Sequence, residues 1–134
     1  MVGVRALIVD GDSMSPTIRR GETVLVEDRA PRRGEVALIE RPDGLLVHRI
    51  LDSVGPWVVH AGDASAAAGI AGIGEVAGRI PLPARRDVPA LRHARLLGMF
   101  LRAAAVLHRI GIRPAGPLRA AAARLKNLLR WPAP

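Results

Sequence analysis

The sequence predicts a mainly β fold, a small, curved, barrel-like antiparallel sheet, followed by a C-terminal helical hairpin. Short aliphatic runs alternate with turn residues up to about residue 80, and the apolar period then changes to that of a helix. A chain of 134 residues has room for one core of ordinary size. We therefore expect a β domain over 1–80, a connector over 81–91 and a basic tail over 92–134.

Six aliphatic runs are the predicted strands. Each is short and is bounded by the Gly, Pro, Asp or Ser residues that favour turns. The "RPDG" turn at 41–44 predicts a hairpin between the strands on either side of it. The runs are 4–9, 22–27, 35–40, 45–51, 56–61 and 75–80.

The connector is defined by its prolines. Pro81, Pro83 and Pro89 each remove a backbone donor and bias the preceding residue toward extended conformations. The charge balance also changes here: residues 1–91 carry 11 Arg and 12 acidic residues, and residues 92–134 carry 8 Arg, one Lys and no acid. A nearly neutral part is therefore followed by a wholly basic one.

The basic tail has helical periodicity. Its arginines fall in a narrow stripe at 100° per residue, beside a wide apolar face. "RPAGP" at 113–117 ends this helix, and a second helix is expected over about 118–130. The arginines of the stripe are Arg92, Arg95, Arg102, Arg109 and Arg113.

The helical hairpin has three interpretations. Its apolar faces pack on each other and on the β domain, with the arginines simply solvated. Alternatively, residues 92–130 lie on an anionic membrane surface, as basic amphipathic helices do. Nucleic acid is the least favoured partner, because the charge suits it but no readout motif is present.

Composition excludes several kinds of chemistry. The chain has no cysteine, so disulfides, thiolate metal sites and a cysteine nucleophile are ruled out. Its three aromatic residues, Trp57, Phe100 and Trp131, are too few for nucleic-acid stacking platforms. No P-loop, dinucleotide fingerprint or metal-ligand set is present, and we expect no cofactor and no metal.

No segment has the length and apolarity of a membrane span or a secretory signal. The most apolar later stretch, 96–112, is interrupted by Arg102, His108 and Arg109. We therefore expect a cytoplasmic protein that is peripheral at a membrane at most.

Ser13, followed by Met14, lies in an unusually constrained segment, "VDGDSMSPTIRRGE" at 9–22. A catalytic serine needs a base within hydrogen-bond reach, and donors for the developing oxyanion. Of the four histidines, only His48 and His60 lie in the β region, whereas His93 and His108 are expected on the helix surface. Ser13 and His48 are the first candidates.

Four segments in order resemble the conserved boxes of type I signal peptidases. "GDSMSPTIRRGETVLV" at 11–26 is similar to the nucleophile box, and "RRGEVALIE" at 32–40 is similar to the next one. "LLVHRI" at 45–50 is similar to the strand that carries the base. "HAGDASAAAGIAGIGEVAGRI" at 60–80 is similar to the closing box.

The resemblance implies the mostly β core that signal peptidases share with self-cleaving repressor proteases. It implies a serine endopeptidase that cleaves leader or signal peptides after small residues. Ser13 would attack the scissile carbonyl, with His48 as general base where bacterial members carry lysine. The backbone N–H of Ser13 and a group near Gly11 would form the oxyanion hole. Met14 and Pro16 would shape the turn and border the substrate.

The role of Asp63 stays open. The family has a further acid several residues after its Gly-Asp pair, but "ASAAAGIAG" at 64–72 contains none. Either Asp63 orients His48 through a ring N–H, or the enzyme works as a Ser-His dyad. His60 is interpreted as a strand residue that faces solvent, or as an alternative base, and Arg49 has no assigned role.

The leading hypothesis is a serine endopeptidase whose substrate, a peptide or precursor protein, adds as a strand to the sheet. The alternative is a peptidase-fold module of weak or no activity that binds peptides or attaches to membranes. A repressor-type protease is disfavoured, because we expect no DNA-binding domain ahead of the core. The sequence does not predict an oligomeric state.

Overall fold

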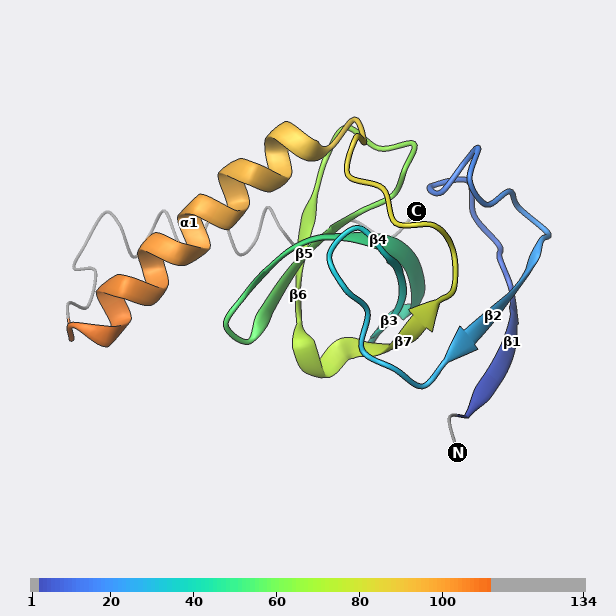
Figure 1. Ribbon diagram of the computed structural model, residues 1–134, viewed down its shortest axis with the longest axis horizontal. Coiled ribbons are helices and arrows are strands. Elements are labelled where there is room, and N and C mark those ends of the chain that lie inside the picture. The colour runs from blue at the N-terminus through green and yellow to red at the C-terminus, as the bar shows by residue number, and fades with distance from the viewer. Residues whose placement is uncertain (1–2, 112–134) are drawn as a thin grey trace.

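The computed structural model describes residues 3–111. It has a seven-stranded antiparallel sheet that curls into an open half-barrel, followed by one long helix (Figure 1). The mainly β prediction is thereby confirmed. The elements are β1 (Val4–Ile8), β2 (Thr23–Glu27), β3 (Val36–Arg41), β4 (Gly44–Val54), β5 (Trp57–Ala61), β6 (Gly69–Gly72), a 3-10 turn (Ile73–Glu75), β7 (Val76–Ile80) and α1 (Leu91–Arg109).

The strand order in the sheet is β1-β2-β7-β3-β4-β5-β6, and every neighbouring pair is antiparallel. All six predicted strands are present, and the "RPDG" turn joins β3 to β4 as expected. Two features were not predicted. β6 is four residues long with Gly at both ends, and β4 continues to Val54 through a register shift between Ile50 and Asp52.

The two faces of the sheet carry separate apolar clusters. On the inner face, a small cluster contains Ala37, Ile39, Ile50, Val58 and Ala71. A larger cluster involves the segment between β1 and β2, residues 9–22, which we call the serine loop. Met14 and Ile18 of this loop are each 1% exposed, so the loop is anchored in the core rather than free at the surface.

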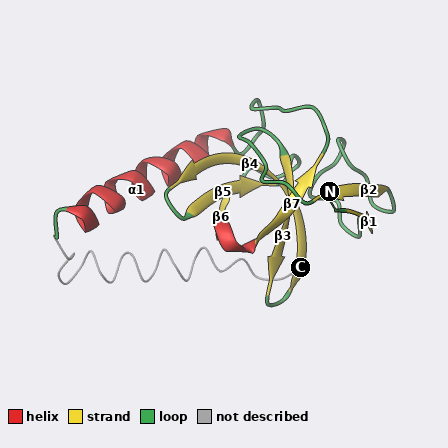
Figure 2. Cartoon of the chain, turned by 60° about the horizontal axis from the view of Figure 1, so that its bottom comes forward, coloured by secondary structure: helices red, strands yellow, loops and turns green. Residues whose placement is uncertain are grey.

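The single described helix, α1, starts beside β4 and β5, and its far end extends beyond the sheet (Figures 1 and 2). Its buried residues are Ala94, Leu97 and Gly98. Arg102 donates two hydrogen bonds to Asp52 of β4, at 2.8 and 2.9 Å. The C-terminal part of residues 3–111 is therefore one helix and not a hairpin, and the predicted second helix, 118–130, lies outside the described residues.

Residues 81–90 contain no strand or helix, and they lie against the core. The Arg85 N–H donates to the Gly34 carbonyl at 2.9 Å. Gly34 has a φ of 88°, and a Cβ there would stand 3.0 Å from the Arg85 carbonyl oxygen, so both backbone angle and space require glycine. No helix in the described part of the chain has the length and apolarity needed to cross a membrane.

Candidate active site

The serine loop is held at two points by the segment that follows β5. The Ala64 N–H donates to the Ser13 carbonyl at 2.9 Å. The Thr17 hydroxyl donates to Asp63 Oδ2 at 2.5 Å. Ser13 itself is exposed. Its main chain is therefore fixed while its side chain is open to a substrate.

Gly62 brings Ser13 onto the same face of the sheet as His48. A Cβ built on Gly62 would stand 2.3 Å from the Ser13 carbonyl oxygen and 2.9 Å from the Ser13 Cβ. Arg49 pairs with Ala61, and the same register extended by one residue places His48 opposite Gly62. Residues opposite each other in an antiparallel pair point to the same face. Ser13 thus lies next to the position that His48 occupies.

No hydrogen bond among residues 3–111 joins the Ser13 hydroxyl to His48. Catalytic hydrogen bonds are often long in unliganded enzymes and tighten when substrate binds. The N–H groups of Ser13 and Gly11 also donate to no acceptor within the described residues. Both are therefore free to donate to an oxyanion.

The imidazole rings of His48 and His60 form a hydrogen-bonded pair. Their Nδ1 atoms are 2.9 Å apart, and the ring centroids are 5.1 Å apart with an interplanar angle of 46°. His60 is 2% exposed, and its ring covers Gly69, where a Cβ would stand 3.1 Å from His60 Cε1. Arg41 Nη2 lies 3.2 Å from His60 Nε2. The expectation that His60 faces solvent was wrong.

Both imidazoles are neutral at pH 7. Burial, reinforced by the positive charge of Arg41, lowers the pKa of His48 to about 4, against a smaller opposing effect of Asp63. Burial, His48 and Arg41 lower the pKa of His60 to about 3. A neutral imidazole has a lone pair on one of its two ring nitrogens, so a neutral His48 is able to accept a proton.

The Asp63 carboxylate is bound by Arg49 rather than by a histidine. Arg49 Nε and Nη2 donate to its two oxygens at 2.8 and 2.7 Å, and Arg49 is completely buried. Burial raises the pKa of Asp63, but the hydrogen bonds from Arg49 and Thr17 outweigh it, so the net pKa is lowered. None of the hydrogen bonds of Asp63 goes to His48. Asp63 thus ties the serine loop to β4.

The remaining predicted positions are divided between core and surface. Met14 is packed in the core, so its side chain does not border an open site, whereas Pro16 is exposed. His93 is half-buried, and its Nδ1 accepts from the Ala68 N–H at 2.9 Å. His108 is exposed near the end of α1, as expected.

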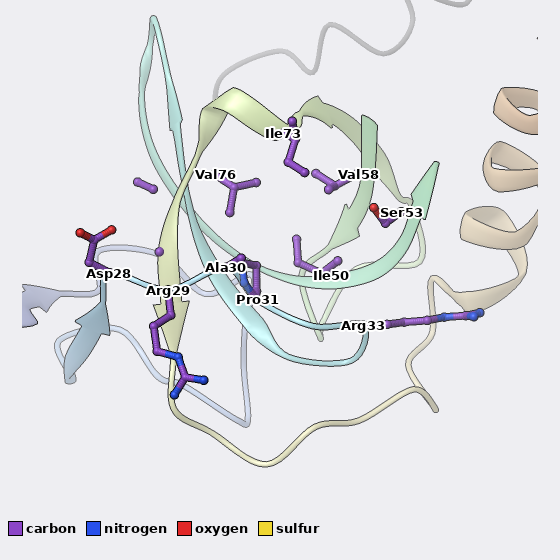
Figure 3. Close-up of a pocket in the computed structure, with 12 residues that line it drawn as sticks. Asp28, Arg29, Ala30, Pro31, Arg33, Ile50, Ser53, Val58, Ile73 and Val76 are labelled. Carbon is purple, nitrogen blue, oxygen red and sulfur yellow. The ribbon is translucent and has the colours of Figure 1, made fainter. Parts of the chain in front are cut away.

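Two pockets lie near these groups. One of about 260 Å³ opens inside the curled sheet, where Ile50, Val58, Ile73 and Val76 point into it (Figure 3). The other, of about 250 Å³, lies between β2 and residues 80–82, and the serine loop contributes Thr17 and Ile18 to it. Neither Ser13 nor an imidazole lines either pocket. Residues 3–111 contain no group of three or more His, Asp or Glu side chains placed to hold a metal ion.

Sequence reasoning gave no site role to Thr17, Arg41 or Arg49. For His60 a signal existed in the "SVGP" turn, which joins β4 to β5 as a hairpin. That signal is misleading, however: counted from the "SVGP" turn, an unbroken register would place His60 opposite Leu51, on the other face from His48. Only the register shift between Ile50 and Asp52, which the sequence did not predict, brings His60 to the face of His48. The Arg49–Asp63 pair had no such signal, because Asp63 lies beyond the end of β5.

The described residues thus combine a curled antiparallel sheet, an anchored serine loop and a pair of hydrogen-bonded imidazoles. Residues 3–67 match the family model described as Peptidase S24-like, just under half of the chain. These residues form a Peptidase S24-like domain of the signal peptidase and repressor-protease superfamily. No curated protein and no solved structure matches the chain.

Proposed function

We propose that the protein is a serine endopeptidase in which Ser13 is the nucleophile and His48 the general base. The observation that carries this proposal is the contact of Ser13 with Gly62, beside the position of His48. The Peptidase S24-like match over residues 3–67 supports serine peptidase activity. The resemblance to signal peptidases suggests leader or signal peptides, cut after small residues, as substrates.

In this mechanism the Ser13 Oγ attacks the scissile carbonyl carbon and its proton moves to His48 Nε2. The carbonyl oxygen becomes an oxyanion, which accepts hydrogen bonds from the free N–H groups of Ser13 and Gly11. The C–N bond then breaks, and the leaving amine takes the proton from His48. Water then attacks the acyl-enzyme. His48 takes a proton from this water as base and gives it to the Ser13 Oγ as that oxygen leaves.

The substrate would bind as an extended strand along β2. β2 pairs with β7 only at Glu27 and Arg79, so residues 23–26 have no strand partner on that side. The second pocket lies at this open edge and is partly lined by the serine loop. A peptide that adds to β2 by main-chain hydrogen bonds would therefore pass beside the loop that carries Ser13.

The proposal is tested with a fluorophosphonate probe and with alanine-rich peptides that contain a glutamate. Wild-type protein should react with the probe at Ser13 and cleave the peptides. Ser13→Ala should abolish both, and His48→Ala should reduce both by at least about 10³-fold, since the base then is lost. Ser53→Ala, an exposed serine on β4, is the control and should react normally. Turnover that survives in Ser13→Ala would remove Ser13 from the mechanism.

A second property, attachment to an anionic membrane surface, is favoured by α1. Five large apolar side chains of α1 and its end are 45–66% exposed, and at 100° per residue they fall within about 120° of arc, opposite the buried face. Within residues 3–111, Arg92, Arg95 and Arg109 form no ion pair. These five, the exposed apolar stripe, are Leu96, Met99, Phe100, Val106 and Ile110.

A further inference from the structure

Arg41, His60 and His48 form a hydrogen-bonded chain that leads to the proposed base. A guanidinium group can only donate, so Arg41 Nη2 donates to His60 Nε2 across 3.2 Å. A neutral imidazole has one proton, which for His60 must then be on Nδ1. This Nδ1–H donates to His48 Nδ1 across 2.9 Å.

The chain fixes the tautomer of His48. Because His48 Nδ1 accepts a hydrogen bond, a neutral His48 has its proton on Nε2. The Nδ1 atom is occupied by His60, so Nε2 is the atom left to take the proton of Ser13. In this arrangement Nε2 is a donor, and the base has no lone pair at the atom that needs one.

We propose that His60 is the positioning residue for His48 and that Arg41 holds the pair in a resting tautomer. This inference rests on the proposed function. When Arg41 no longer donates to His60 Nε2, the shared proton passes from His60 Nδ1 to His48 Nδ1. His48 Nε2 gives its proton to water, and His60 Nε2 takes one up from water. His60 Nδ1 then accepts from His48 as the acid of a catalytic triad does, and His48 Nε2 is free to accept.

The surroundings of Arg41 indicate which kind of group would draw it away from His60. Arg41 is half-buried, and among residues 3–111 it forms no ion pair, whereas its neighbour Glu40 pairs with Arg5. A carboxylate is a much stronger partner for a guanidinium than a neutral imidazole is. We assign the release to a carboxylate of the peptide substrate, which makes Arg41 a specificity-determining residue for acidic peptides.

The tautomers are measured directly by long-range ¹H–¹⁵N correlation of the histidine rings at pH 7, with His48→Gln and His60→Gln for assignment. Wild-type protein should show His48 protonated on Nε2 and His60 on Nδ1. Arg41→Met should reverse both. Arg5→Met, which removes an exposed arginine that contacts neither imidazole, should leave them unchanged. Wild-type His48 protonated on Nδ1, or unchanged tautomers in Arg41→Met, would overturn the inference.

The release is tested on wild-type protein with two capped alanine peptides, one with a glutamate and one with a glutamine at the same position. The glutamate peptide should move His48 toward protonation on Nδ1, and the glutamine peptide should not. Equal effects of the two peptides would overturn the role of the carboxylate.

The reaction of Ser13 with fluorophosphonate separates this inference from the proposed function. Arg41→Met should react about tenfold faster than wild type, and Arg5→Met at the wild-type rate. If the tautomers reverse in Arg41→Met while Ser13 reacts in no variant, Arg41 does set the tautomers of His48 and His60, and the peptidase proposal fails.

Discussion

At the residue scale, the pair formed by the half-buried His48 and the buried His60 couples stability to pH. The pKa values of His48 and His60 in the folded protein, about 4 and about 3, lie below the value of about 6.5 in the unfolded chain. The unfolded state therefore binds more protons below pH 6.5. The stability that these groups contribute is fully present above pH 6.5 and is lost as the pH falls toward 4.

We expect the free energy of unfolding to fall between pH 6.5 and 5, by up to about 1.4 kcal/mol per pH unit for each histidine. Urea denaturation at several pH values measures this slope. His60→Gln should flatten it, because one of the two protonation sites is gone. His108→Gln, an exposed histidine near the end of α1, should keep it. A His60→Gln variant with the wild-type slope would contradict the burial of a neutral imidazole pair.

The role of Asp63 follows from the burial of Arg49. The completely buried guanidinium of Arg49 needs a carboxylate, and Asp63 supplies both of its oxygens. Arg49 Nη1 also donates to the Gly34 carbonyl at 2.6 Å and the Pro83 carbonyl at 3.2 Å. The network joins β4, the connector and the serine loop, which makes Asp63 a support for the position of Ser13.

At the element scale, the serine loop and the end of β5 must approach closely. Gly62 allows this approach, because any larger residue would place its Cβ inside the contact distance of the Ser13 main chain. The main chain of Ser13 is also held by the Ala64 N–H and cannot simply move aside. The loop and the end of the strand therefore act as one unit.

Gly62→Ala should displace Ser13 and lower its rate of reaction with fluorophosphonate by on the order of 10²-fold, since a shift of about 1 Å at a reacting group has an effect of that size. Gly74→Ala is the matched control, because a Cβ there meets nothing within 4 Å. Circular dichroism checks that both variants are folded. Equal rates for Gly62→Ala and wild type would show that this contact does not position the nucleophile.

At the scale of the whole molecule, α1 places an apolar surface away from the sheet. The start of the helix packs on β4 and β5, and its far end extends beyond the sheet (Figure 2). Ala94, Leu97 and Gly98 are buried, and the exposed apolar stripe lies on the opposite side of the helix. Residues 92–134 contain nine basic residues and no acid. An apolar stripe flanked by cations fits the interface of an anionic bilayer.

Wild-type protein should sediment with phosphatidylserine-containing vesicles and much less with neutral ones. The double variant Leu96→Gln, Phe100→Gln should lower the partition coefficient at least about tenfold, since burial of each such side chain contributes about 1.5–3 kcal/mol. Trp57→Gln, which removes an exposed apolar side chain from β5, is the control. Equal partitioning of the double variant and wild type would exclude this surface as the attachment site.

The sequence by itself determined the local structure of this protein. Strand positions follow from short aliphatic runs between turn residues, and the serine segment is recognisable because its signal is contiguous. β6 was not predicted, because "GIAG" has too few side chains to show the two-residue alternation of a strand.

Only the tertiary structure decided which polar groups meet. The contact of His60 with His48, the pairing of Arg49 with Asp63 and the approach of Arg41 to His60 all join residues at least 12 positions apart. A buried donor or acceptor takes whichever partner the packing brings within reach, and this depends on the curl of the sheet rather than on spacing in the chain.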